Sequence, residues 1–174
     1  GKNGLFVALE GMTFDGHDFL TVAKERGATG AVVKRGKTIE GLVCIEVEDT
    51  LQAYQQLATY HRRRFPIPII GITGSSGKTT TKEMISAVLE KAFTVLKTEK
   101  NYNNEIGVPK MLLQLTEDHD VCVLEMGMRG LGQIAELAEI AEPTIGVITN
   151  VGTSHIELLG SQENIGKAKQ ELIE

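Results

Sequence analysis

The sequence has neither an excess of basic residues nor a long apolar run. Its 18 lysines and arginines are outnumbered by 23 acidic residues, so the formal net charge is −5 at pH 7. A chain of this charge has no overall attraction for nucleic acid or for an anionic membrane, so a phosphate-bearing ligand must be held by a local site. No apolar stretch approaches the roughly 18 residues of a membrane span, and no signal sequence opens the chain. We expect no nucleic-acid partner and no membrane span.

Cysteine is scarce, because only Cys44 and Cys122 are present. Both lie inside short apolar runs, where cysteine usually serves as a small buried hydrophobic residue. The two residues do not have the spacing of a metal site. The sequence therefore predicts two reduced thiols in a cytoplasmic protein.

Internal repeats and low-complexity segments are also absent, and the 41% content of hydrophobic residues is ordinary for a globular protein. Pro66 and Pro68 follow a helical pattern that they cannot continue, so they mark the expected domain boundary. We therefore expect an α/β protein with a small α/β domain over residues 1–65 and a parallel-sheet domain over residues 66–174.

The expected elements follow from the spacing of apolar residues. In the first domain, strands are expected at residues 5–9, 30–33 and 42–47, and helices at residues 18–26 and 51–64. In the second, strands are expected at residues 67–73, 93–97, 120–126 and 144–150, and helices at residues 78–91, 108–115, 131–141 and from residue 161. This alternation predicts a mostly parallel sheet with helices on both faces and a ligand site beyond the carboxyl ends of its strands.

The second domain contains the sequence Gly-Ile-Thr-Gly-Ser-Ser-Gly-Lys-Thr at residues 71–79, between an apolar strand and an amphipathic helix. A glycine-rich turn in this position leaves backbone N–H groups free at the positive end of a helix, where they can hold phosphate oxygens. In this geometry Lys78 reaches the β- and γ-phosphates of a nucleotide, and the Thr79 hydroxyl ligates Mg²⁺. The spacing is Thr-Gly-x-x-Gly-Lys-Thr, since Ile72 replaces the first glycine of the stricter pattern. The expected nucleotide-binding residues are Gly74, Ser75, Ser76, Gly77, Lys78, Thr79 and Thr80.

Two further residues follow strands of the same domain. Glu125 ends an apolar strand, at the position where nucleotide-binding folds place a carboxylate that holds Mg²⁺. A carboxylate directly after four apolar residues needs a partner. His155 lies in the loop after the next strand, and neutral imidazole is an acceptable but less common ligand of Mg²⁺. We expect Thr79, Glu125 and His155 as metal ligands, with an ordinary loop histidine as the alternative for His155.

Together these segments resemble the Mur ligases, the ATP-dependent amide-forming enzymes of peptidoglycan precursor synthesis. The resemblance extends through residues 5–9, 14–19, 71–80, 101–109, 125–127 and 149–155. Within the family, residues 103–109 and 149–157 look most like the member that adds the terminal dipeptide. The resemblance implies ATP and Mg²⁺ as cofactors, and a UDP-muramoyl tripeptide and D-Ala-D-Ala as small-molecule substrates.

The resemblance also implies the chemistry of the site. In the family, a peptide carboxylate attacks ATP to give an acyl phosphate, which an amine then converts to the amide. Lys78 and Mg²⁺ would neutralise the negative charge of the carboxylate and of the ATP phosphates. Thr79 and Glu125 would be ligands of one Mg²⁺ ion, and His155 a ligand of a second. Lys169 matches a lysine that is carbamylated in the family, and the alternative is a surface lysine on a solvated helix face. The candidate catalytic residues are Lys78, Lys169 and His155.

The first domain resembles the UDP-sugar-binding domain of the family. Asp15, Gly16 and His17 are therefore candidate substrate contacts, with a polar turn as the alternative, and Asn103 and Asn104 are further candidates in the second domain. A family segment before residue 5 and the amine-binding third domain have no counterpart in this sequence. We expect a fragment that is inactive by itself, from an enzyme that is monomeric at full length.

The residues leave two other functions open. Another ligase of the same superfamily, such as a folylpolyglutamate or cyanophycin synthetase, shares the phosphate loop but lacks the segment at residues 14–19. A phosphate-loop ATPase or GTPase that acts as a switch predicts either a guanine-reading Asn-Lys-x-Asp sequence or the stricter loop, and neither occurs. Protection by UDP-muramoyl peptide or by GTP distinguishes these classes. The third residue of the peptide, lysine or diaminopimelate, is not determined by the sequence.

Overall fold

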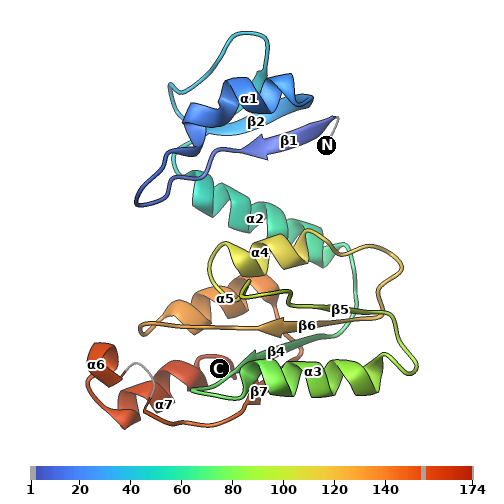
Figure 1. Cartoon of the computed structure of the whole chain (residues 1–174), viewed down its shortest axis with the longest axis vertical. Helices are drawn as coiled ribbons and strands as arrows, with labels where there is room; N and C mark the ends of the chain where they lie inside the picture. Colours follow the sequence, from blue (N-terminus) through green and yellow to red (C-terminus); the bar gives the residue numbers. More distant parts are fainter. Residues whose placement is uncertain (1–2, 154–155, 174) are drawn as a thin grey trace. The chain divides into compact units, whose positions relative to one another are not determined.

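The computed structural model describes residues 3–153 and 156–173, and the chain forms two compact units, Gly1–Leu57 and Ala58–Glu174 (Figure 1). Both units are α/β with parallel sheets, which confirms the expected fold class. Both cysteines are free, as the sequence predicts. Within the described residues, no helix combines the length and the apolar character that crossing a bilayer requires.

The first unit is built on a parallel sheet in the order β1 (Gly4–Val7), β2 (Ala28–Lys34) and β3 (Val43–Val47). A 3₁₀ turn, η1 (Gly16–Phe19), leads into helix α1 (Leu20–Glu25), which packs against β2. The core of this unit consists of small and aliphatic side chains, namely Ala8, Leu20, Ala31 and Val33. The strands and α1 agree with the expected elements, and η1 begins two residues before the helix expected at residues 18–26.

The second unit is built on a parallel sheet in the order β5 (Val95–Lys97), β6 (Val121–Glu125), β4 (Ile69–Thr73) and β7 (Ile145–Ile148). Its helices are α3 (Lys78–Leu89), α4 (Gly107–Leu112), α5 (Gln133–Ala141), α6 (Ile156–Leu159) and α7 (Gln162–Gln170). The four strands and all these helices except α6 were expected. Because β4 lies between β6 and β7, the loops that follow these three strands meet at one edge of the sheet.

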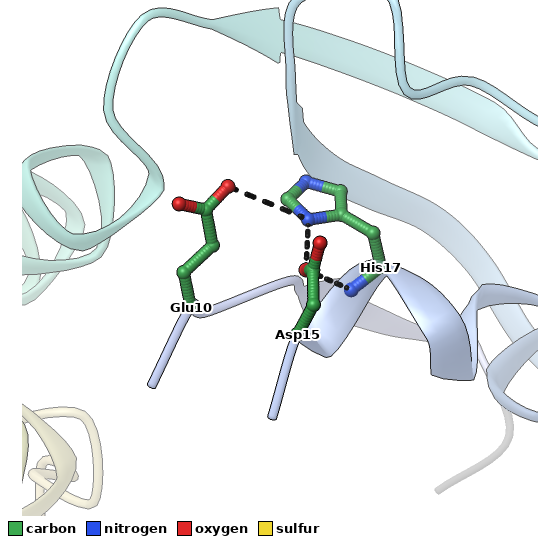
Figure 2. A group of neighbouring side chains, drawn as sticks. All are labelled: Glu10, Asp15 and His17. Atoms are coloured by element: carbon green, nitrogen blue, oxygen red, sulfur yellow. Dashed lines mark hydrogen bonds and ion pairs between the residues drawn. The ribbon is translucent and has the colours of Figure 1, made fainter. Parts of the chain in front are cut away.

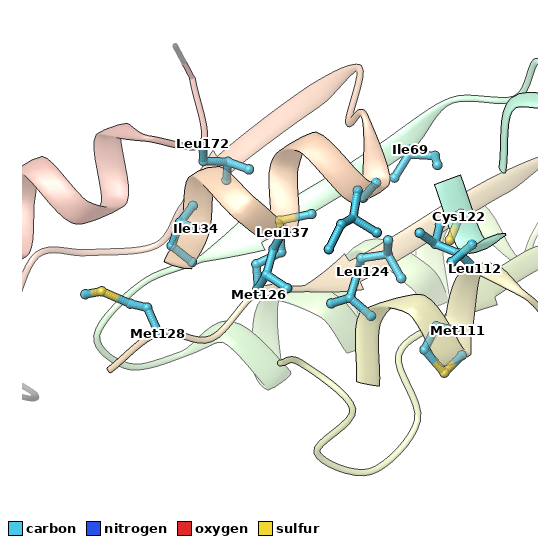
Figure 3. Packing of buried hydrophobic residues seen from close by; sticks show 14 of the residues in the cluster. Ile69, Met111, Leu112, Cys122, Leu124, Met126, Met128, Ile134, Leu137 and Leu172 are labelled. Atoms are coloured by element: carbon cyan, nitrogen blue, oxygen red, sulfur yellow. The ribbon is translucent and has the colours of Figure 1, made fainter. Parts of the chain in front are cut away.

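Both faces of this sheet are covered by helices, as the apolar composition of its central strands predicts. In β6, Cys122 and Leu124 contribute to one cluster of buried residues, whereas Val121 and Val123 contribute to another. The first cluster includes side chains from α4, α5 and α7, and Figure 3 labels Leu112 of α4 and Leu137 of α5. Apolar side chains of α3, among them Leu89, pack against the second. Helices on both faces hold the strand ends, and the loops that follow them, in fixed positions.

Helix α2 (Thr50–Arg63) contains the division between the two units, which falls after Leu57. The proline pattern places this boundary after residue 65 instead. The last turns of α2 explain the difference, because Ala58 is fully buried in the core of the second unit and Arg62 is only 8% exposed. The Arg62 guanidinium donates hydrogen bonds to carbonyl oxygens at the end of α5 and so caps that helix.

Candidate active site

A tight glycine-rich turn links β4 to α3 at the predicted phosphate loop. Gly74 has a φ of +151° and Gly77 a φ of +79°, conformations that residues with a side chain rarely adopt. A Cβ atom on Gly74 would also lie 1.8 Å from the hydroxyl oxygen of Thr149, which directly follows β7. The path of the backbone therefore requires both glycines, and the loop packs closely against the neighbouring strand end.

The backbone N–H groups of this loop fall into two sets. Those of Ser75 and Ser76 donate to Asn150, at 3.2 Å to its carbonyl oxygen and 3.1 Å to its side-chain oxygen, respectively. Those in the first turn of α3 have no acceptor within the described residues, and they belong to Lys78, Thr79 and Thr80. The second set lies at the positive end of the helix, where N–H groups can hold phosphate oxygens.

The Lys78 side chain turns back toward this loop, and its Nζ donates a hydrogen bond to Gly74 O at 2.7 Å. The ammonium group is thereby held at the start of α3, where free N–H groups also lie. Charge-assisted contacts from a lysine are well suited to phosphate. The loop is therefore a positive local site in a chain whose net charge is −5.

Glu125, at the end of β6, accepts a hydrogen bond from the Thr79 hydroxyl, with 3.2 Å between Oγ1 and Oε2. The pairing of β4 with β6 places Ile72 opposite Glu125, which brings the carboxylate to the phosphate loop. Glu125 is only 2% exposed, and its Oε1 has no hydrogen-bond donor in the described part of the chain. A hydroxyl and a buried carboxylate are oxygen ligands of the kind that Mg²⁺ prefers, so these residues fit the predicted metal site.

Lys169 lies on α7 with only 2% of its surface exposed, which differs from the solvated lysine of the alternative interpretation. Burial and, to a smaller extent, the positive charge of Lys78 lower the pKa of Lys169. Lys169 is therefore a buried amine in an environment that disfavours its charged form.

Asn103 and Asn104 both support the backbone of the second unit. The Gly127 N–H group, just after β6, donates to Asn103 O at 2.7 Å. The Asn104 side-chain oxygen accepts a hydrogen bond from the Gly107 N–H group at 2.9 Å, which caps the start of α4. Asn103 therefore lies next to the strand end that carries Glu125, whereas the side-chain oxygen of Asn104 is used within the fold.

In the first unit, the ring of His17 is hydrogen-bonded at both nitrogens, and Figure 2 shows the contact of Nδ1 with Asp15. Nε2 accepts a hydrogen bond from the backbone N–H group of Lys34 at 2.9 Å, so this nitrogen carries no proton. The proton of the neutral ring is then on Nδ1, which donates to Asp15 Oδ1 at 2.5 Å. The same oxygen accepts from the His17 backbone N–H group, and these two bonds lower the pKa of Asp15.

Glu10 joins Asp15 and His17 in a group whose potential ligand atoms lie within 4.8 Å of one another (Figure 2). Both nitrogens of His17 are already in use, so this tautomer offers no lone pair to an ion. Glu10 instead forms an ion pair with Lys34, whose Nζ lies 3.3 Å from Oε2. The group is thus a polar network that joins the turn before η1 to strand β2.

The structure brings several of the predicted catalytic and metal-binding residues to one edge of the second sheet. Lys78, Thr79 and Glu125 meet there. Lys169 is buried in the same unit, and the charge of Lys78 contributes to lowering its pKa. His155 lies outside the described residues, so its predicted role as a ligand stays a prediction. The predicted substrate contacts around Asp15 belong to the other unit.

Two residues of this edge do not stand out in the sequence, namely Asn150 and Lys82. Asn150 lies two positions beyond the end of β7, and its place in the segment at residues 149–155 is the sequence signal that points to it. Lys82 lies one helical turn after Lys78 and is 3% exposed, and its Nζ lies 3.5 Å from Glu125 Oε1. Its spacing from Lys78 places it on the same side of α3, but its burial cannot be read from the sequence.

The chain is similar to several known proteins. A family model described as the Mur ligase middle domain matches residues 72–174. The UDP-N-acetylmuramoyl-tripeptide–D-alanyl-D-alanine ligase of Synechocystis sp. is 58% identical over 174 residues. The alignment covers 97% of this chain and 38% of that ligase.

Two solved structures resemble the chain closely. MurF from Acinetobacter baumannii matches with a TM-score of 0.93 and 38% identity, over 98% of this chain and 38% of that chain. A MurF ligase from Thermotoga maritima in complex with ADP matches with a TM-score of 0.91 and 38% identity, over 99% of this chain and 40% of that chain. The chain therefore spans 38% to 40% of the length of these three relatives.

Proposed function

Because the chain belongs to the Mur ligase family, we propose that it acts in an ATP-dependent ligase that joins D-Ala-D-Ala to a UDP-N-acetylmuramoyl tripeptide. The names of its relatives support this pair of substrates. The observation that carries the proposal is the single sheet edge at which Lys78, the free N–H groups of α3 and the Thr79–Glu125 pair meet. Such an edge suits a nucleoside triphosphate with a divalent cation.

We assign ATP binding to residues 66–174 and binding of the UDP-muramoyl group to residues 1–65. The matched middle domain and the relative in complex with ADP support the first assignment. In the first domain, the turn at Asp15, Gly16 and His17 is the proposed substrate contact. Since the His17 ring and the backbone N–H groups of Gly16 and His17 are engaged internally, Asp15 Oδ2 is the group left for a ligand. We place the reaction in the cytoplasm and propose that the enzyme acts as a monomer.

The proposed reaction has two steps. The tripeptide carboxylate attacks the γ-phosphate of ATP, which forms an acyl phosphate and ADP, and the amine of D-Ala-D-Ala then attacks the acyl carbon and releases phosphate. Two anions approach each other in the first step, so the Lys78 ammonium and the free N–H groups of α3 would stabilise its transition state. When bound, Mg²⁺ would be held by Thr79 and Glu125 and would supply further positive charge at the phosphates. His155 is proposed as a ligand of a second ion.

We further propose that Lys169 is carbamylated by CO₂. Only the neutral amine reacts, and the lowered pKa of Lys169 increases the neutral fraction at a given pH. A carbamate would replace the repulsion between Lys169 and Lys78 by attraction. It would also add a carboxylate near the site proposed for the metal.

The small molecules that stabilise the chain test the proposed function. Thermal unfolding is followed with ATP and Mg²⁺, with UDP-muramoyl tripeptide, and with GTP and Mg²⁺. A ligand that binds the folded state raises the midpoint, so we expect a rise with ATP and with the tripeptide but not with GTP. A rise with GTP alone would favour a phosphate-loop switch and contradict the ligase.

Replacing Glu125 with glutamine is expected to raise the Mg²⁺ concentration needed for half-saturation by about 10-fold or more. Glutamine keeps the shape of the side chain but is a poorer ligand for a hard cation, so ADP binding without Mg²⁺ should not change. Calorimetric titration of Mg²⁺ at saturating ADP measures the midpoint. The control is Glu117→Gln, at an exposed position away from the sheet edge. Equal midpoints in Glu125→Gln and the unmodified chain would mean that Glu125 is not a ligand.

Intact-mass measurement under gentle native conditions is expected to find one added CO₂ on the chain. Because the carbamate forms from the neutral amine, the modified share should rise with bicarbonate and with pH. Lys169→Ala should remove this adduct, whereas Lys167→Ala should retain it, since Lys167 is paired with Glu163. Persistence of the adduct in Lys169→Ala, or its absence from the unmodified chain at high bicarbonate, would contradict the proposal.

A further inference from the structure

Lys82 is a buried lysine of α3 that the proposed reaction does not use. Its Nζ donates to Thr98 O at 2.8 Å and lies 2.8 Å from Glu83 Oε1. These two short contacts fix the ammonium group, and Glu125 Oε1 lies 3.5 Å from it. At that separation the contact is an ion pair and not a hydrogen bond, which agrees with the absence of a hydrogen-bond donor to Oε1 among the described residues.

Thr98, which directly follows β5, connects Lys82 to Glu125 through a second route. Its carbonyl oxygen accepts from Lys82, and its hydroxyl oxygen accepts from the Glu125 backbone N–H group at 2.9 Å. Thr98 is 1% exposed, so neither bond competes with water. One buried residue therefore fixes both the ammonium group and the backbone of the residue that carries the carboxylate.

We propose that Lys82 is a positioning residue that holds Glu125 as a one-oxygen metal ligand. Lys82 lies beside Oε1, whereas Oε2 lies toward the Thr79 hydroxyl, so the two carboxylate oxygens have different partners. A buried carboxylate needs a compensating charge when no ion is bound, and Lys82 supplies it. Residues that orient a metal ligand in this way change metal affinity without touching the metal.

The surroundings of Lys82 assign it to this role and not to phosphate binding. It lies between two carboxylates, and the hydrogen bonds of Lys82 and Lys97 lower the pKa of Glu83 to about 2. Two of its three N–H groups are used by Thr98 and Glu83. A lysine this buried and this engaged has no freedom to follow a nucleotide, in contrast to Lys78 in the loop.

This inference rests on the proposed function, because it needs Glu125 to be a ligand of Mg²⁺. The experiment measures ADP affinity of the chain by calorimetry with and without Mg²⁺, and the ratio of the two affinities is the gain due to the metal. Lys82→Met is expected to reduce this gain by about 10-fold or more. ADP affinity without Mg²⁺ should stay unchanged, and a general loss of structure would lower both affinities.

Lys97→Met is the matched control, because Lys97 also pairs with Glu83 but makes no contact with Glu125 in the described structure. It should keep the full gain. The double variant Lys82→Met/Glu125→Gln should lose no more of the gain than Glu125→Gln alone, since both changes act on one ligand.

Three outcomes would overturn the proposal. The first is a normal gain in Lys82→Met together with a lost gain in Glu125→Gln. This result would show that the metal site exists but that Lys82 does not contribute to it. The second is a normal gain in Glu125→Gln, which places the failure in the proposed metal site itself. The third concerns a Lys82→Met variant that does not fold. In that case the double variant, which removes the uncompensated carboxylate, should fold again. A double variant that stays unfolded would show that Lys82 has only a structural role.

Discussion

Replacing Lys78 with alanine is expected to weaken ADP binding by about 30-fold or more while the chain stays folded. Loss of a charge-assisted contact with phosphate costs about 2 kcal/mol or more, which corresponds to that factor. The fold should persist because alanine is favourable in a helix and Lys78 stands in the first turn of α3. The hydrogen bond that its Nζ donates to Gly74 O is a small loss by comparison.

Calorimetry with ADP and Mg²⁺ measures this loss, and thermal unfolding checks that the fold persists. Lys91→Ala is the matched control, since Lys91 is an exposed lysine just beyond the end of the same helix. It removes one positive charge from the chain without changing the loop, so it isolates the general effect of charge. Equal ADP affinity in Lys78→Ala and the control would show that the loop is not the phosphate site.

Replacing Gly16 with alanine is expected to destabilise the first unit by about 3 kcal/mol, at the upper end for overpacking. A Cβ atom on this buried glycine would lie 2.5 Å from Leu9 O and 2.7 Å from Leu9 N. These are backbone atoms, so no side-chain rotation relieves the clash. The Gly16 N–H group also donates to Leu9 O at 2.8 Å, and any separation would weaken that bond. The position of His17, which follows directly, depends on the same turn.

Hydrogen exchange measured on peptides from each unit tests this expectation. A loss of about 3 kcal/mol corresponds to roughly 150-fold faster exchange at the most protected N–H groups of β2. ADP affinity should be retained, because the hydrogen bonds that shape the phosphate loop come from residues of the second unit. Gly36→Ala is the control: Gly36 has a φ of +78° and open space around it, so alanine there costs about 1 kcal/mol. Equal effects of the two variants would contradict the backbone clash.

The hydrophobic pattern predicts every strand and all the longer helices of the described chain. Each of these elements buries one face or both. Apolar residues then recur at every second position in a strand or about every 3.6 positions in a helix, or they form a continuous run where both faces are buried. The pattern does not predict α6 or the first half of η1, and each of these elements has four residues. One turn is too short to show a helical period, so neighbouring contacts decide its conformation.

Near the boundary between the units, the sequence does not reveal that the end of α2 is buried. Residues 61–64 form a basic run at the end of a helix, a pattern typical of a solvated end. Arg62 is instead buried, because carbonyl oxygens at the end of α5 accept its hydrogen bonds. Those carbonyls lie nearly eighty positions further along the chain, where no local pattern points back to Arg62.

The sequence by itself determined the α/β class, the glycine-rich turn between β4 and α3 and the carboxylate at the end of β6. Each depends on consecutive residues, whose backbone conformation and apolar spacing restrict one another directly. Only the tertiary structure decided which N–H groups of the loop are free, that both nitrogens of His17 are hydrogen-bonded within the fold, and that Lys82 reaches Glu125. The first and third of these features depend on the strand order β5-β6-β4-β7, which brings Thr98, Glu125 and the loop together from separate parts of the chain. The second depends on the contact of His17 with the end of β2 in the other sheet. Strand order follows from packing of the whole domain, and local residue patterns do not encode it.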